Sequence, residues 1–134
     1  MTAPLTLRSR NDMPSILIIE YDSAVGQLFE TALRTAGYDV YLAGSAAEAY
    51  ETLRRTSVEM VITDINMPSG AGLQIISVVR QDFPATKIVG ISREASEFDP
   101  VQAAPLLDGV EMLPNPIGVN HLLGTVQRVL AGPG

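Results

Sequence analysis

Four polar residues that are far apart in the sequence each follow a short apolar run. They are Glu20, Asp64, Ser92 and Asn115. The run before Asp64, Met60–Thr63, is too short for a buried helix and rich in β-branched residues, and the other runs are similarly short, which predicts buried strands. In an open α/β sheet, ligands bind in the crevice outside the carboxyl ends of the strands. We therefore expect the four side chains to line one ligand-binding pocket.

Asp64 is the centre of this pattern. The run Met60–Thr63 leads into it, and residues 66–72 then read Asn-Met-Pro-Ser-Gly-Ala-Gly. Because a proline disfavours helix at the residue before it, this segment is expected to form a turn before the next helix begins. An aspartate that only caps a helix is the alternative interpretation, but the buried strand before Asp64 favours a role in the pocket.

The elements that must position these residues alternate along the chain. Strands are predicted at 15–20, 38–42, 60–64, 87–91 and 109–113, and helices at about 25–36, 45–55, 73–83 and 119–130. Residues 94–108 include Pro100 and Pro105, each of which costs a helix interior about 3 kcal/mol, so a short or distorted helix is expected there. Alternating strands and helices favour the α/β class, with a doubly wound, five-stranded parallel sheet and helices on both faces.

Composition limits the class of protein and its partners. The chain has 134 residues, of which 46% are hydrophobic, and a net charge of -6. This size fits one domain, and we expect a flexible leader over 1–14, the domain over 15–131 and a tail over 132–134. The negative charge argues against a nucleic-acid partner. No run approaches the ~20 apolar residues of a membrane span, so we expect a cytoplasmic protein with no membrane partner.

The stretch around Asp64 resembles the receiver domain of two-component response regulators. Asp64, Met67-Pro68 and Gly72 match the family pattern D-x-x-M-P-x-x-x-G, and the resemblance covers about residues 15–131. It implies a flavodoxin-like receiver fold with strand order 2-1-3-4-5 and a phosphoacceptor at Asp64. It also implies a histidine kinase or histidine phosphotransfer protein as partner, and a homodimer formed through the fourth and fifth helices.

The resemblance also implies a metal site, which this chain alters. The family has two adjacent acids after the first strand that hold Mg²⁺, and the matching residues here are Glu20 and Tyr21. The implied Mg²⁺ ligands are thus Glu20 and Asp64, with Asp22 as a possible substitute for the second acid.

Other positions of the family site match unevenly. Ser92 matches the hydroxyl residue that contacts a phosphoryl oxygen, whereas Asn115 stands at the position of the family lysine. Met112 takes the place of an aromatic residue on the fifth strand. Lys87 is too far away to replace the missing lysine, because it begins the fourth strand, ~15 Å from the pocket. Arg93 is the nearby cation that could replace it.

Three functions follow as hypotheses. The favoured one is a divergent receiver domain that acts in a phosphorelay or as a protein-interaction module, with weakened metal and lysine support for Asp64. The alternative is a working phosphoreceiver that a histidine kinase phosphorylates on Asp64. In neither case is it an enzyme beyond self-catalysed phosphoryl transfer and hydrolysis. A small flavodoxin-like enzyme or nucleotide-binding domain ranks last, because residues 20–24 lack phosphate-binding glycines.

Overall fold

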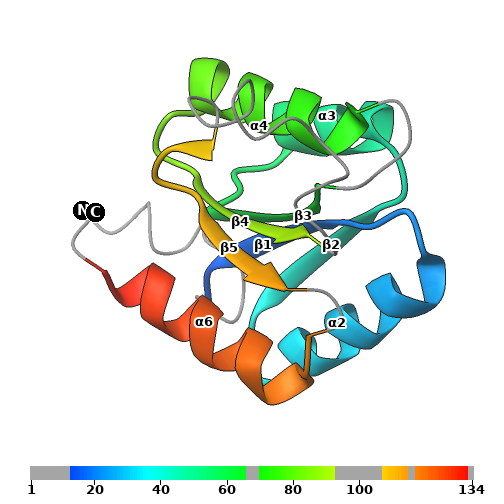
Figure 1. The fold of residues 1–134 in the computed structure, drawn as a ribbon, viewed down its shortest axis with the longest axis vertical. Coiled ribbons are helices and arrows are strands. Elements are labelled where there is room, and N and C mark those ends of the chain that lie inside the picture. Colours follow the sequence, from blue (N-terminus) through cyan, green and yellow to red (C-terminus); the bar gives the residue numbers. More distant parts are fainter. Residues whose placement is uncertain (1–12, 66–69, 93–106, 115–116, 133–134) are drawn as a thin grey trace, which may run out of the picture.

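The strands form one parallel sheet at the centre of the molecule (Figure 1). The computed structural model describes residues 13–65, 70–92, 107–114 and 117–132. The strands are β1 (Ser15–Ile19), β2 (Asp39–Ala43), β3 (Met60–Asp64), β4 (Lys87–Ser92) and β5 (Glu111–Pro114). They lie in the order β2-β1-β3-β4-β5, and each neighbouring pair is parallel. The predicted doubly wound sheet and its strand order are confirmed.

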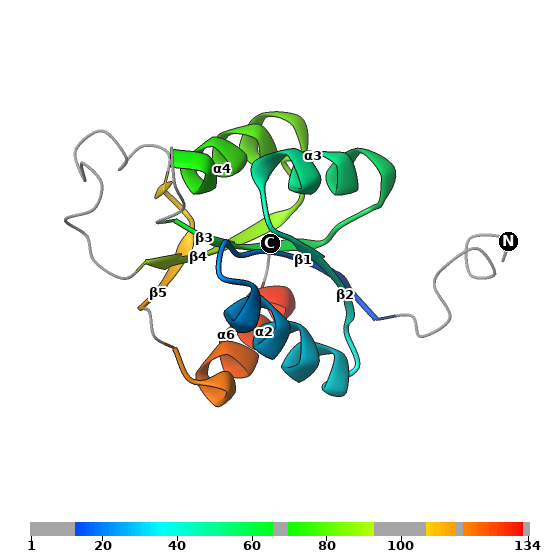
Figure 2. The ribbon, with the colours of Figure 1, turned by 90° about the vertical axis from the view of Figure 1, so that its right-hand side faces the viewer.

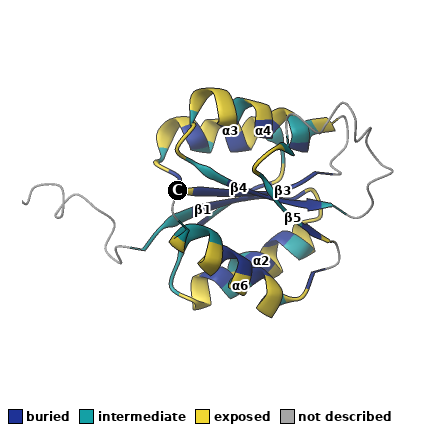
Figure 3. Ribbon diagram, turned by 60° about the vertical axis from the view of Figure 1, so that its left-hand side comes forward, coloured by how far each residue is buried: buried dark blue, intermediate teal, exposed yellow. Residues whose placement is uncertain are grey.

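Helices cover both faces of the sheet. The described part contains α2 (Ser23–Thr35), α3 (Ala46–Arg55), α4 (Ala71–Asp82) and α6 (Val119–Ala131). Figure 2 shows α3 and α4 on one face, and α2 and α6 on the other. In Figure 3 the sheet is the buried layer, and the helices turn their exposed sides away from it. This three-layer arrangement follows from crossover connections between parallel strands.

Side chains of each strand alternate between two apolar cores. Ile16 and Ile18 of β1 join the core beneath α2 and α6, whereas Leu17 and Ile19 join the core beneath α3 and α4. All four are almost completely buried. A strand that is covered on both faces must be apolar at successive positions, which explains why the central strands read as continuous apolar runs.

Polar side chains cap two of the helices at their amino ends. The Ser45 hydroxyl accepts a hydrogen bond from the Glu48 N–H at 3.2 Å, and the Glu48 carboxylate accepts one from the Gly44 N–H at 2.8 Å. The first bond satisfies a backbone donor that the helix leaves free, as the spacing of Ser45 and Glu48 predicts, and the second binds the chain just before the N-cap. Asp22 caps α2 in a similar way and is described with the site below.

Two details differ from the sequence-based expectation. β5 begins at Glu111 rather than at residue 109, because Gly109 adopts a left-handed turn with φ of 81°. Leu28 and Tyr50 belong to the apolar residues from which the helices at 25–36 and 45–55 were predicted, but they are 53% and 41% exposed. The buried residues of α2 are Gly26, Phe29 and Leu33, which form a stripe too narrow to include Leu28.

Three predictions lie wholly or largely outside the described residues: the leader, the helix within 94–108, and the tail. The domain boundaries therefore stay a prediction. At the start of the described part, the Pro14 carbonyl accepts a hydrogen bond from the Asp39 N–H at 3.1 Å. Of the helices in the described part, none is both long enough and apolar enough to span a bilayer.

Candidate functional site

Glu20 and Asp64 meet at the carboxyl edge of the sheet. Ile19 of β1 pairs in register with Thr63 of β3, so the next residue of each strand lies beside the other. The backbone fixes both positions, since Glu20 N–H donates to the Ala43 carbonyl at 3.1 Å and Ile65 N–H donates to the Ile91 carbonyl at 2.8 Å. The two acids are only 5% and 6% exposed, and their side chains hydrogen-bond to each other.

This contact changes the protonation of Glu20. The pKa of the Glu20 carboxyl is raised from 4.5 to about 7, mainly by burial and further by the charge of Asp64 and the hydrogen bond to it. The Asp22 N–H, which donates to Glu20 Oε2 at 3.3 Å, acts in the opposite direction. Two buried carboxylates in contact repel each other unless a proton or a cation lies between them. Near neutral pH the Glu20–Asp64 pair therefore holds a proton for part of the time.

Two glycines let helices approach these acids closely. A Cβ atom on Gly26 of α2 would lie 3.4 Å from Glu20 Cβ and 2.9 Å from Leu42 Cδ1. A Cβ atom on Gly72 of α4 would overlap the Asp64 carbonyl oxygen. Both positions fall within helices, and a single glycine in a helical pattern is a sequence signal for such close packing. The motif around Asp64 includes Gly72, whereas the role of Gly26 was not predicted.

The residues that follow Glu20 point elsewhere. The Asp22 carboxylate caps α2, accepting hydrogen bonds from Ala24 N–H at 3.0 Å and Val25 N–H at 3.3 Å. Tyr21 is 66% exposed, so its ring does not fill the space beside Asp64. The position of the second family acid is therefore taken by a side chain in solvent, and Asp22 is engaged with the helix.

Ser92 and Met112 lie on β4 and β5, on the side of Asp64 away from Glu20. Ile91 pairs in register with Asp64, so Ser92, which ends β4, lies one residue beyond that pair and is partly exposed. Met112 pairs with Gly90, and a Cβ atom on Gly90 would lie 2.8 Å from the Met112 Sδ atom. The absence of a side chain at Gly90 thus makes room for Met112, a relationship that sequence analysis missed.

Other candidates lie away from the acids or outside the described residues. Asn115 and Arg93 fall outside the described part. Lys87 pairs with Met60, at the opposite end of β3 from Asp64, as its place in the sequence predicts. His121 is exposed on α6.

The two acids offer a minimal site for Mg²⁺. Magnesium binds oxygen ligands and is often held by one or two carboxylates, with water completing its shell. Glu20 and Asp64 are of this kind and already lie in contact. Among the described residues, no third acidic, histidine or cysteine side chain gathers with them as a metal cluster. The pair therefore fits one Mg²⁺ with few protein ligands.

Comparison with known proteins shows which family and which relatives the chain is similar to. The model for the response regulator receiver domain matches residues 16–127. The transcriptional regulator NtrC of Bradyrhizobium sp. is 28% identical over 119 residues, which are 89% of this chain and 25% of that protein. The sensor kinase CckA of Brucella abortus is 28% identical over 118 residues, 87% of this chain and 12% of that protein. The chain thus spans a quarter or less of these relatives.

Solved structures agree in fold. The chemotaxis response regulator CheY4 of Vibrio cholerae superimposes with a TM-score of 0.76 at 26% identity, covering 87% of this chain and 98% of that one. A response regulator from Thermotoga maritima gives a TM-score of 0.76 at 22% identity, covering 90% and 99%.

Proposed function

Because the chain belongs to the response regulator receiver domains of two-component signalling, we propose that Asp64 is its phosphoacceptor and that phosphate is accepted there only slowly. The observation that carries this proposal is the contact between Glu20 and Asp64, with the pKa of Glu20 raised to about 7. A site with only two acids, one of which tends to keep a proton, attracts a divalent cation less strongly than a site with three ionised acids.

Receiver domains generally bind Mg²⁺ at the phosphorylation site. In this chain Glu20 and Asp64 would hold the ion. When bound, it would neutralise charge on the phosphoryl oxygens during transfer. Two departures from the family pattern support a slow reaction. An exposed tyrosine, Tyr21, stands at the position of the second family acid. Asn115, whose amide carries no charge, stands at the position of the family lysine.

The residues of the chain have distinct roles in the proposed transfer. A carboxylate oxygen of Asp64 attacks the phosphorus atom and forms a new P–O bond. The bond from phosphorus to the donor breaks, and its electron pair leaves with the donor, a histidine nitrogen of a kinase or phosphotransfer protein. The Ser92 hydroxyl would donate a hydrogen bond to a phosphoryl oxygen. Such transfers depend on positioning and charge neutralisation, so missing charges lower the rate.

We also propose the partners of this chain and its location in the cell. Receiver domains are in general non-enzymatic signalling modules that interact with histidine kinases. For this chain we propose a kinase or phosphotransfer partner in the cytoplasm, with the slow chemistry favouring a role in protein interaction. A homodimer, and the lack of nucleic-acid or membrane partners, remain part of the proposal.

Labelling with acetyl phosphate tests this function. We expect slow phosphorylation of the wild-type chain in millimolar Mg²⁺, and none in Asp64→Asn, which keeps the size of the side chain but removes the nucleophile. Ser92→Ala should slow the reaction further without unfolding the protein. Rapid labelling that depends on Mg²⁺ and disappears in Asp64→Asn would instead establish a fully working phosphoreceiver.

One observation favours the second candidate function, a fully working phosphoreceiver. Tyr21 is 66% exposed, so its ring does not occupy the space beside Asp64. A fully working phosphoreceiver would also bind Mg²⁺ below millimolar concentration, which a titration followed by NMR measures directly.

A further inference from the structure

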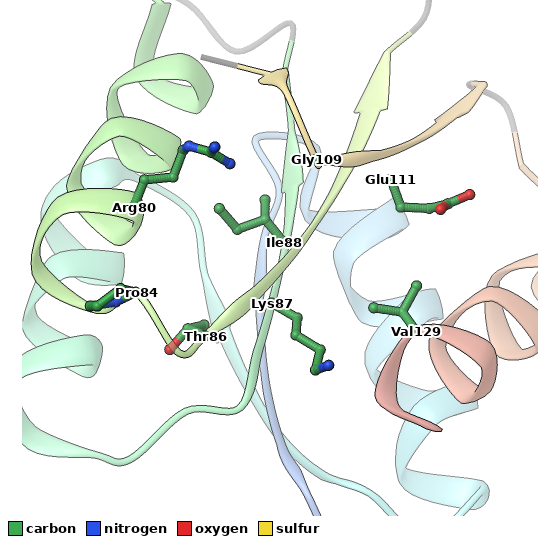
Figure 4. Close-up of a pocket in the computed structure, with 8 residues that line it drawn as sticks. All are labelled: Arg80, Pro84, Thr86, Lys87, Ile88, Gly109, Glu111 and Val129. Atoms are coloured by element: carbon green, nitrogen blue, oxygen red, sulfur yellow. The ribbon is translucent and has the colours of Figure 1, made fainter. Parts of the chain in front are cut away.

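A cavity lies at the amino end of β4, at the opposite edge of the sheet from Asp64. It has a volume of about 460 Å³, and its walls come from α4, β4, α6 and the segment that leads into β5 (Figure 4). Lys87 and Ile88 of β4 form its floor, with Arg80 of α4 and Val129 of α6 on its two sides. Nothing in the phosphoryl transfer proposed above uses these residues.

The cavity borders the first two residues of β4, which lie before the point where β5 begins to pair with it. β4 pairs with β3 from Lys87 onward, whereas its pairing with β5 begins at Val89. The Lys87 N–H donates to the Glu59 carbonyl on the β3 side at 3.0 Å. Among the strands of the described part, none lies along the other edge of β4 at Lys87 and Ile88. An open strand edge is a template for pairing with another extended chain.

Two cations flank this open edge on opposite faces of the sheet. Ile88 belongs to the core beneath α3 and α4, so the neighbouring Lys87 points to the other face, towards α6. Arg80 reaches the cavity from α4 on the first face, and Lys87 extends on the second, as Figure 4 shows. The edge of β4 therefore carries one positive side chain above it and one below it.

Both cations are available to a ligand. In the described ranges, ion pairs join Arg34 to Glu30, Arg54 to Glu51 and Arg128 to Glu111. Neither Arg80 nor Lys87 forms an ion pair within those ranges. The acid that also lines the cavity, Glu111, is neutralised by Arg128, which donates two hydrogen bonds to it at 3.3 and 3.0 Å. On a chain with a net charge of -6, this cavity is thus a local site of positive charge.

We propose that this cavity binds an extended segment of a partner protein that carries two adjacent acidic residues. Successive side chains of an extended chain point to opposite faces. If the segment lies along the open edge of β4, one carboxylate meets Arg80 and the next meets Lys87. Two acids separated by one residue would point to the same face and could reach only one cation. The site therefore selects for the order of the acids as well as for their charge.

Two peptides of identical composition test this selection. The first is acetyl-Thr-Val-Glu-Glu-Val-Thr-amide, with adjacent acids, and the second is acetyl-Thr-Glu-Val-Glu-Val-Thr-amide, with acids on one face. Each is titrated into the full ¹⁵N-labelled chain. We expect the first peptide to shift the amide signals of Thr86, Lys87 and Ile88 and to bind about two- to fivefold more tightly, the factor that one exposed ion pair supplies.

Variants of the two cations complete the test. Arg80→Gln and Lys87→Gln should each weaken binding of the first peptide about two- to fivefold, and Lys87→Gln should abolish the difference between the peptides. Arg55→Gln removes an exposed cation outside this cavity and should change neither affinity. Equal binding of the two peptides to the wild type, shifts confined to other amides, or unchanged affinity in the Arg80→Gln/Lys87→Gln double variant would overturn the proposal. Asp64→Asn should bind both peptides normally, so this test is independent of phosphorylation.

Discussion

The carbonyl oxygen of Asp64 lies directly against the α carbon of Gly72, so no side chain fits between the end of β3 and the first turn of α4. A Cβ atom on Gly72 would also lie 3.0 Å from the Ile65 α carbon. These neighbours are backbone atoms, which cannot rotate away as the end of a side chain can. The position of Asp64 relative to α4 therefore depends on a glycine eight residues further along the chain.

Gly72→Ala is expected to destabilise the fold, even though alanine favours helix over glycine. The extra methyl group must push β3 and α4 apart, and overpacking of this kind typically costs about 1–3 kcal/mol. Urea denaturation measures the loss. Gly124→Ala in α6 is the matched control, because that glycine is exposed and nothing lies within 4 Å of the added atom. The control should gain up to about 1 kcal/mol, and a similar gain at Gly72 would contradict the close approach.

The Glu20–Asp64 contact predicts an unusual dependence of stability on pH. The pKa of Glu20 rises from 4.5 to about 7 on folding, so the folded state favours the protonated acid. This contribution is fully present below pH 4.5 and is lost as the pH rises through 7. Glu20→Gln mimics the protonated form. We expect it to match the wild type near pH 4.5 and to exceed its stability above pH 7 by roughly 2–3 kcal/mol.

The measurement for Glu20→Gln is the free energy of unfolding between pH 4.5 and 8.5. Glu51→Gln serves as the control, since Glu51 is half exposed and forms a surface ion pair with Arg54. Its difference from the wild type should stay small across this range. A wild-type protein that is as stable as Glu20→Gln at pH 8 would show that folding does not raise the pKa of Glu20.

The sequence was sufficient to predict the sheet and the meeting of its polar ends. Continuous apolar runs that end in polar residues indicated parallel strands. The strand order implied by the resemblance to receiver domains then placed Glu20 beside Asp64, which the register confirms. The hydrogen bond between the two acids was not predicted. It depends on side-chain geometry at the strand ends, which hydrophobic periodicity does not determine.

Other failures have physical reasons of the same kind. Leu28 and Tyr50 are apolar residues of helices, but the stripe that each helix buries is narrower than its apolar residues suggest, so both are exposed. The start of β5 was placed too early because a left-handed turn at Gly109 cannot be distinguished by composition from the first residue of a strand. The roles of Gly26 and Gly90 in close packing were not predicted, because they depend on side chains of other elements that pack against each glycine.

Mg²⁺ binding should depend on Glu20 far more than on Asp22. Glu20 contacts Asp64, whereas the Asp22 carboxylate accepts the two hydrogen bonds that cap α2. Glu20→Gln should weaken Mg²⁺ binding by roughly tenfold or more, equivalent to at least about 1.4 kcal/mol. Asp22→Asn preserves the cap, because asparagine is an equally good capping residue, and should change the affinity by less than about threefold.

The shift of the Ile65 amide signal on addition of MgCl₂ measures this affinity. Because the ion competes with the proton that Glu20 holds, the dissociation constant of the wild type should increase as the pH falls below 7. In Glu20→Gln it should vary less with pH. If Asp22→Asn weakened binding as much as Glu20→Gln, the cap would have to open to make Asp22 a ligand.

Restoring an acid at position 21 should strengthen the site. Tyr21 is 66% exposed, so Tyr21→Asp removes little packing and should change the free energy of unfolding by no more than about 0.5 kcal/mol. The new carboxylate follows Glu20 directly and adds a third oxygen ligand near Asp64, so Mg²⁺ binding should tighten by roughly tenfold. Labelling by acetyl phosphate should accelerate in parallel, since the bound ion offsets charge on the phosphoryl oxygens.

Ser23→Asp separates this effect from a general increase in negative charge. Ser23 is exposed at the first position of α2, so an acid there adds the same charge to the neighbourhood and favours the helix dipole. Position 23 does not directly follow the end of a strand, so we do not expect its side chain to be directed towards Asp64. We expect Ser23→Asp to tighten Mg²⁺ binding by less than about threefold. Equal gains in the two variants would mean that Tyr21 occupies no ligand position, and that the slow chemistry of Asp64 has its cause at Asn115.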